Sequence, residues 1–120
     1  MRLTPLALLF AGLALWIVLW PLASRADDVA FAGTWASDVG QCKTDQSVEG
    51  APLILTATSY NQGEAHCTFD SVSQDSGAWL AKAKCSVEGE DQDGTFTFVV
   101  DGDKLTIRDD SGERSLSRCP

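Results

Sequence analysis

Apolar and polar residues alternate more regularly in the segment 78–87 than anywhere else in this 120-residue chain. A repeat of two places successive side chains on opposite faces of a β-strand, with one face buried and the other in water. No long segment after residue 26 has the 3.6-residue period of a helix, so the pattern predicts a β-sheet protein. The buried face would carry Trp79, Ala81, Ala83, Cys85 and Val87, and the outer face Leu80, Lys82 and Lys84.

Further short segments of strand-forming residues recur about every ten residues, separated by clusters of Gly, Asp, Asn and Ser. The expected turns lie at 60–63, 74–77 and 109–112, and an acidic connection is expected at 88–94. This spacing predicts an all-β fold, a small antiparallel meander that forms a barrel or sandwich of about seven or eight strands. The six other expected strands are 31–36, 53–58, 64–72, 95–100, 104–108 and 113–118.

The first 26 residues have the layout of a secretory signal peptide. Arg2 precedes a long apolar run, and the small residues Ser24 and Ala26 lead into two aspartates. We expect cleavage after residue 26, a single domain at 27–120, and a location in the periplasm or outside the cell. The alternative is an uncleaved anchor, because the apolar run is nearly long enough to span a bilayer.

Four cysteines, Cys42, Cys67, Cys85 and Cys119, lie in the expected domain. Their even number and scattered spacing predict two disulfides formed in an oxidising compartment, whereas structural zinc sites usually bring ligands in close pairs. Three pairings are open. Cys67 and Cys85 would face each other across a hairpin and could bond there. We expect instead Cys42 with Cys67 and Cys85 with Cys119, which would tie the first loop and the C-terminus to the hairpin.

Residues 27–120 carry seven basic and 17 acidic side chains. This charge argues against nucleic acid as a partner and, after signal cleavage, against anionic membrane surfaces, because both attract basic patches. It favours a basic protein partner, although many exported proteins are acidic for solubility alone.

No segment forms a recognisable catalytic centre. His66, the only histidine, is expected in mid-strand on the polar face, without a carboxylate placed to orient it. The acidic residues gather in turns, where they are solvated, and no pair of them stands out. We therefore predict a protein that is not an enzyme and needs no cofactor.

The acidic connection also invites comparison with a calcium loop. Asp91 and Asp93 match the third and fifth positions of an EF-hand, but Gly89 stands at the first position and Val100 at the last. A weaker site shared with the aspartates of 101–103 is the remaining alternative. We predict no metal site.

Gly33-Thr34-Trp35 resembles the Gly-x-Trp signature of lipocalin-type barrels. The resemblance implies that Trp35 closes one end of the barrel, with a basic residue of the last strand, Arg114 or Arg118, lying over the indole. The chain is much shorter than a lipocalin, so no large ligand cavity is expected.

The chain is also similar to small bacterial periplasmic inhibitor barrels. Inhibitors of secreted metalloproteases begin with the same Gly-x-Trp, and inhibitors of c-type lysozyme are exported, disulfide-bonded barrels of this size. The lysozyme inhibitors use a Ser-Gly-x-x-Tyr motif, whose serine enters the enzyme cleft. This chain has Ser76 and Gly77, with Trp79 one place before the tyrosine position, and lacks the second motif, Tyr-x-x-x-Thr-Lys-Gly. The resemblance implies a binding turn made of Asp75, Ser76, Gly77 and Trp79.

These observations predict an exported binding protein, a monomer or a dimer, that inhibits a basic host enzyme such as c-type lysozyme. It would act through the turn 74–77 and its acidic loops, whereas a protease inhibitor would use the segment 27–30. The alternative is a small-ligand-binding or envelope-structural barrel without inhibitory activity. In that case a narrow interior would be lined by Trp35, Trp79, Phe96 and Phe98.

Overall fold

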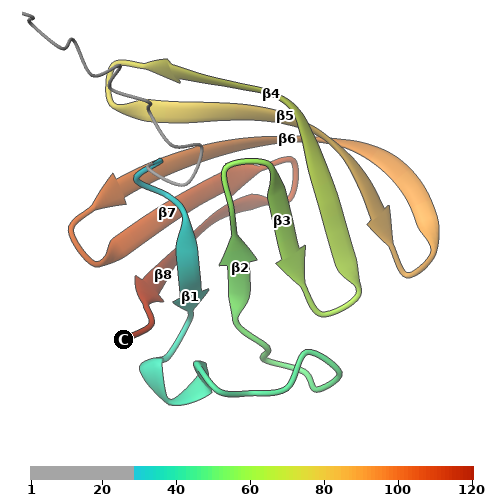
Figure 1. The fold of residues 1–120 in the computed structure, drawn as a ribbon, viewed down its shortest axis with the longest axis vertical. Coiled ribbons are helices and arrows are strands. Elements are labelled where there is room, and N and C mark those ends of the chain that lie inside the picture. The colour runs from blue at the N-terminus through green and yellow to red at the C-terminus, as the bar shows by residue number, and fades with distance from the viewer. Residues whose placement is uncertain (1–28) are drawn as a thin grey trace, which may run out of the picture.

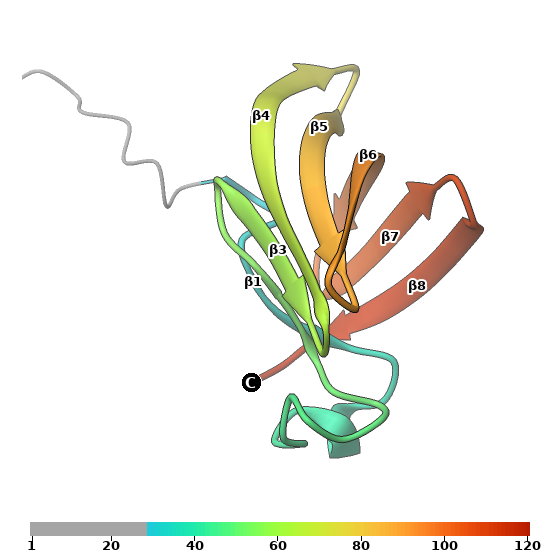
Figure 2. The same cartoon turned by 90° about the vertical axis from the view of Figure 1, so that its right-hand side faces the viewer.

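The computed structural model describes residues 29–120, and the expected signal peptide 1–26 lies outside the described residues. Eight antiparallel strands form a closed barrel in which each strand pairs with the next and the last pairs with the first (Figures 1 and 2). The prediction of an all-β antiparallel meander is confirmed, and of the two expected architectures the barrel is the observed one.

The strands follow one another along the chain, and a single turn of 3₁₀ helix, Val39–Gln41, lies in the long connection between the first two. Among residues 29–120 no helix has the length and apolar character needed to cross a membrane. The strands are β1 Gly33–Ala36, β2 Leu53–Leu55, β3 Ser59–Gln62, β4 Ala65–Asp75, β5 Ala78–Val87, β6 Glu90–Asp101, β7 Lys104–Asp109 and β8 Gly112–Arg118.

The segment 60–63, expected to be a turn, is mostly strand β3, and that expectation was wrong. Tyr60 pairs with Cys67 of β4, and its side chain is buried. The chain turns earlier than predicted, after Leu55, where the Thr56 hydroxyl accepts a hydrogen bond from the Thr58 N–H at 3.2 Å. Burial of the tyrosine ring therefore outweighs the turn preference of the Asn, Gln and Gly that follow it.

The acidic segment 88–94, expected to be a connection, is also mostly strand. The turn between β5 and β6 is only Glu88 and Gly89, both with positive φ (52° and 82°), and Val87 pairs directly with Glu90. A two-residue turn of this kind matches the twist of the strands that it joins. The first residues of β6 are exposed and lack apolar alternation, which is why their strand character was missed.

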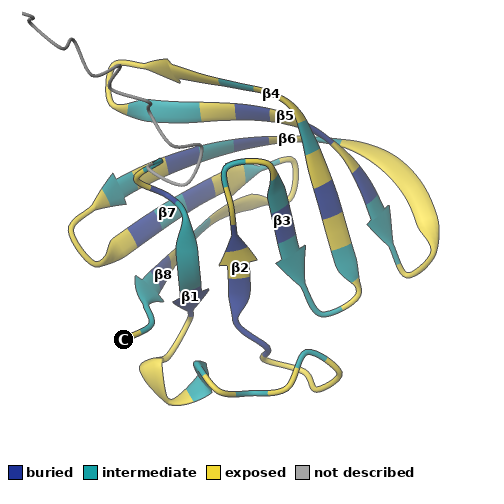
Figure 3. Ribbon diagram, viewed as in Figure 1, coloured by how far each residue is buried: buried dark blue, intermediate teal, exposed yellow. Residues whose placement is uncertain are grey.

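The alternation along β5 is confirmed, because Ala81, Ala83 and Cys85 are buried, while Lys82 and Lys84 are exposed (Figure 3). Inside the barrel, aromatic rings form a continuous column along the axis. Ring centroids are 4.9 Å apart for Phe31 and Phe98, 5.8 Å for Phe98 and Phe96, and 4.8 Å for Phe96 and Tyr60.

The disulfides are Cys42–Cys119 and Cys67–Cys85, so the expected pairing was wrong. Cys67 and Cys85 are direct partners in the register of β4 and β5, and both side chains point into the barrel. The two remaining cysteines meet because the Cys119 N–H donates to the Thr34 carbonyl at 2.8 Å, which places the C-terminus beside β1 and the loop that follows it.

Removing the disulfides should destabilise the barrel to different extents. Cys42–Cys119 spans 77 residues and Cys67–Cys85 spans 18, and a longer loop restricts the unfolded chain more. We expect the double alanine variant of the first pair to lose about 4 kcal/mol and that of the second about 3 kcal/mol from loop entropy, before any loss of core packing. Denaturant titration measures both, and peptide mapping without reductant checks the pairing. Recovery of Cys42 linked to Cys67 would contradict the structure.

Candidate functional site

The two ends of the barrel differ in construction. Because the strand direction alternates, the turns at 56–58, 76–77 and 102–103 lie at one end, together with the segment 29–32. We call this the plugged end. The turns at 63–64, 88–89 and 110–111 lie at the opposite end, which we call the open end.

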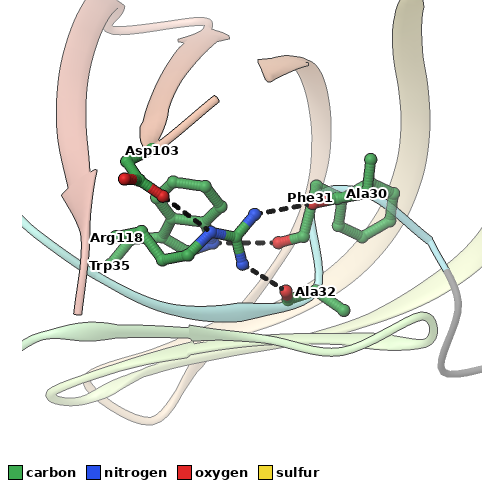
Figure 4. Close-up of polar contacts among 6 residues, drawn as sticks. All are labelled: Ala30, Phe31, Ala32, Trp35, Asp103 and Arg118. Carbon is green, nitrogen blue, oxygen red and sulfur yellow. Dashed lines mark hydrogen bonds and ion pairs between the residues drawn. The ribbon is translucent and has the colours of Figure 1, made fainter. Parts of the chain in front are cut away.

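At the plugged end, Arg118 of β8 lies over the indole of Trp35, with its guanidinium carbon 4.2 Å from the ring centroid (Figure 4). The guanidinium also donates hydrogen bonds to the Ala32 carbonyl at 3.2 Å and the Ala30 carbonyl at 3.1 Å. Its Nε lies 3.9 Å from Asp103 in the β6–β7 turn. One side chain thus joins the last strand, the first strand and the segment before it.

The Gly-x-Trp signature has a local physical reason here. A Cβ atom on Gly33 would lie 2.8 Å from the Arg118 Nη1 atom, and Gly33 has φ of +146°. Trp35 is fully buried, and its Nε1–H donates to the Phe31 carbonyl at 2.9 Å. Glycine therefore leaves the space through which the arginine reaches the indole.

Phe31 fills the barrel next to this contact. Its ring lies 5.5 Å from that of Trp79 and 6.2 Å from that of Phe69, in edge-to-face geometry. Phe31, Trp35 and Phe98 are completely buried. The interior expected to bind a ligand is therefore a packed core, formed in part by Trp35, Trp79, Phe96 and Phe98. Of these residues, Phe96 also lines a cavity at the open end.

The predicted binding turn is the tip of the β4–β5 hairpin. Asp75, Ser76 and Gly77 are exposed, Ser76 and Gly77 have positive φ (50° and 83°), and the Ser76 hydroxyl donates to the Asp75 carboxylate at 3.2 Å. Trp79 lies apart from this surface, because its ring packs on Phe31. The structure thus brings three of the four predicted binding residues together on the surface.

A cavity of about 460 Å³ lies at the open end and was not expected from the sequence. Its apolar walls belong to the inner face of the barrel, and Asp93, Asp109 and Asp110 border it. The sequence signal was weak, because the wall residues come from four separate strands, and two of them, Tyr60 and Gly94, lie in segments that were expected to be a turn and a connection. The apolar walls are Tyr60, Ala65, Cys67, Cys85, Val87, Gly94 and Phe96.

Polar groups surround the Tyr60 hydroxyl at the edge of this cavity. The Arg114 guanidinium donates to that hydroxyl, and to the Gln62 side-chain oxygen at 3.1 Å. Burial raises the pKa of Tyr60 above its usual value, and the charge of Asp109 adds to this, while Arg114 opposes it. Of the two arginines expected as candidates to cover Trp35, Arg114 therefore contacts Tyr60 and Gln62 at the open end instead.

Negative charge is concentrated at the open end. In residues 29–120, eight acidic and three basic side chains lie within four residues of its turns, against three acidic and one basic within four residues of the turns of the plugged end. The eight acidic residues are Glu64, Glu88, Glu90, Asp91, Asp93, Asp109, Asp110 and Glu113.

His66 lines a surface depression together with Asp91 and Asp93, and these residues form no metal centre within the described part of the chain. His66 is exposed on the outer face, with Nδ1 2.8 Å from the Asn61 side-chain oxygen. No group of three potential metal ligands occurs in residues 29–120. Asp91 and Asp101, which the alternative calcium site would bring together, lie near opposite ends of β6.

No protein-family model, curated protein or solved structure matches the chain.

Replacing Arg118 should weaken the plugged end. Arg118→Gln removes the contact with the indole and the charged hydrogen bonds to two carbonyls, so we expect a loss of about 2 kcal/mol in unfolding free energy. Arg108→Gln is the matched control, because among residues 29–120 the Arg108 side chain pairs only with the exposed Glu113, and its loss should cost less than about 1 kcal/mol. Equal losses in denaturant titrations of the two variants would contradict this assignment.

Tyr60 is the only tyrosine in the chain, so its ionisation can be followed directly by ultraviolet absorbance. Because its pKa is raised in the folded state, it should ionise above pH 10.0 in native protein. The associated stability is complete below the unfolded pKa and falls as the pH rises through the folded value. Arg114→Gln should raise the native midpoint further. A native midpoint no higher than that of protein in denaturant would contradict the prediction.

Proposed function

We propose that this protein is an exported barrel that acts by binding a basic protein, with c-type lysozyme as the first candidate, and performs no chemistry of its own. The observation that supports this proposal best is the unequal charge of the two ends. Lysozymes of this class are strongly basic, and an acidic face accelerates and orients encounters with a basic partner.

Two surfaces are available for such a partner. The tip of the β4–β5 hairpin, around Ser76 and Gly77, is exposed, and the strands that support it pair up to Asp75 and Ala78. A turn held in this way loses little conformational freedom on binding. The acidic surface lies at the other end of the barrel, so substitutions can test the two surfaces separately.

The state of the N-terminal segment favours a lysozyme-type target over a metalloprotease. A protease inhibitor of the resembling class would insert the segment 27–30 into the cleft of its target. The Ala30 carbonyl accepts a hydrogen bond from the Arg118 guanidinium, and the Val29 carbonyl accepts one from the Ala32 N–H at 3.0 Å. Residues 29 and 30 are thus held against the barrel rather than extended from it.

Export to the periplasm or the extracellular space is part of the proposal. Its support is the presence of two disulfides, which form and persist in oxidising compartments.

A turbidity assay of lysozyme with residues 27–120 tests the proposal. We expect inhibition at micromolar protein and low salt, and its loss at high salt, because surface charges are screened there. Absence of inhibition at low salt would overturn the lysozyme proposal and leave the alternative, a small-ligand-binding or envelope-structural barrel.

Three variants identify the surface that is used. Glu88→Gln with Glu90→Gln should raise the inhibitor concentration needed by about threefold to tenfold, whereas Asp70→Asn with Asp101→Asn, which makes the same change in net charge, should have less effect. Ser76→Ala tests the hairpin tip. If Ser76→Ala still inhibits and the inhibition is salt-sensitive, the acidic surface remains the proposed binding surface and the hairpin tip is excluded.

A further inference from the structure

The open-end cavity has the dimensions and walls of a small-molecule site. Its volume of about 460 Å³ lies in the usual range for ligand pockets, about 300–1,000 Å³. The aromatic column that fills the rest of the barrel stops at Tyr60 and Phe96, whose rings form part of the cavity wall. At the other end, Phe31 and Trp35 occupy the corresponding space. The described part of the barrel is thus filled at the plugged end and hollow at the open end.

Small residues keep this space open. Gly94 contributes no side chain, and a Cβ atom there would lie 3.2 Å from Cys85 Sγ and 3.4 Å from the Phe96 ring. Ala65 and Val87 complete the wall around the Cys67–Cys85 disulfide. The body of an aryl or branched alkyl ligand would pack on this apolar part of the wall, beside the polar residues Gln92, Thr95 and Ser111, which also line the cavity.

The charged groups at the edge of the cavity determine which ligand it fits. The side-chain oxygen Oδ1 of Asp109 accepts the N–H and hydroxyl of Ser111, at 2.8 Å and 2.7 Å, while Oδ2 has no hydrogen-bond partner in residues 29–120. Neither Asp109 nor Asp110 forms an ion pair with a described residue. Arg114 is directed to the Tyr60 hydroxyl and Gln62, in a neighbouring depression that Asp109 also lines. The carboxylates of Asp109 and Asp110 are therefore available to bind a cation, because the nearby guanidinium of Arg114 is held in hydrogen bonds to other groups.

We propose that the open end of the barrel binds a small organic cation with an apolar body, such as an aryl- or alkylammonium. The ammonium group would lie against Asp109 and Asp110, and the body between Tyr60, Phe96 and the disulfide. Carboxylates attract the charge, and aromatic rings add cation–π attraction. This inference does not rest on the lysozyme proposal, because it concerns the inner face of the barrel and a different class of ligand.

Three probes of similar shape and different charge test the proposal: phenethylammonium, 2-phenylethanol and 3-phenylpropanoate. Titration of residues 27–120 by NMR, followed at the Val87 methyl groups and the Tyr60 ring, reports on the cavity without lysozyme. We expect the ammonium to bind about tenfold more tightly than the alcohol, and the carboxylate not to bind. Tightest binding of the carboxylate would show that Arg114 controls the site and would overturn the proposal, as would the absence of shifts with all three probes.

Substitutions at the edge and in the wall complete the test. Asp109→Asn with Asp110→Asn should weaken phenethylammonium binding about tenfold, and Asp70→Asn with Asp101→Asn, equal in charge but distant in the fold, should leave it within about twofold. If the two double variants lost the same affinity for phenethylammonium, the loss would be due to net charge alone, and the proposed binding site would be contradicted.

Ala65→Leu fills the cavity and should abolish binding in a protein whose cooperative unfolding shows that it is folded. Should this variant not fold, Ala65→Val serves in its place, with a smaller loss expected. A folded variant with a filled cavity and unchanged affinity would place the ligand elsewhere.

Discussion

The contact of Arg118 with Trp35 is the interaction on which the closure of this barrel depends. The first and last strands share only two residue pairs in their register, which is a short seam for a sheet that must close on itself. Arg118 strengthens that seam by covering the indole and by donating hydrogen bonds to the Ala30 and Ala32 carbonyls. The Cys42–Cys119 disulfide follows Arg118 directly in the sequence and links the end of β8 covalently to the connection after β1. Side-chain contacts and a covalent bond thus supplement a short ladder of hydrogen bonds.

Closure of one end has consequences for the other. Phe31 and Trp35 fill the plugged end, and the aromatic column continues through Phe98 to Phe96, so the middle of the barrel is a packed core. A small barrel has little room beyond such a core. The remaining space lies between the last rings and the acidic turns, where Gly94 keeps the wall open. The two proposals therefore use different parts of one end: the outer charged surface for a protein and the inner wall for a small cation.

Much of the fold was predictable because strand alternation and turn residues are local properties of a sequence. The pattern of 78–87 predicted its inward and outward faces, and the glycine-containing turns 74–77 and 109–112 marked two hairpins. The predictions failed where burial depends on distant residues. Tyr60 is in a strand because Cys67 pairs with it and Phe96 stacks on it, and Glu90 is in a strand because Val87 pairs with it. None of these three partners can be identified from the residues immediately beside Tyr60 or Glu90.

The sequence by itself determined that this is a β-protein with an acidic surface and two disulfides, because composition, period and cysteine count do not depend on which segments meet. Gly-x-Trp further implied a tryptophan covered by an arginine, without distinguishing Arg114 from Arg118. Only the tertiary structure decided the disulfide pairing, the arginine that covers Trp35, and the cavity beside Gly94. Each of these depends on strand register, which sets the residues that face one another across the barrel and is settled only when all eight strands close together.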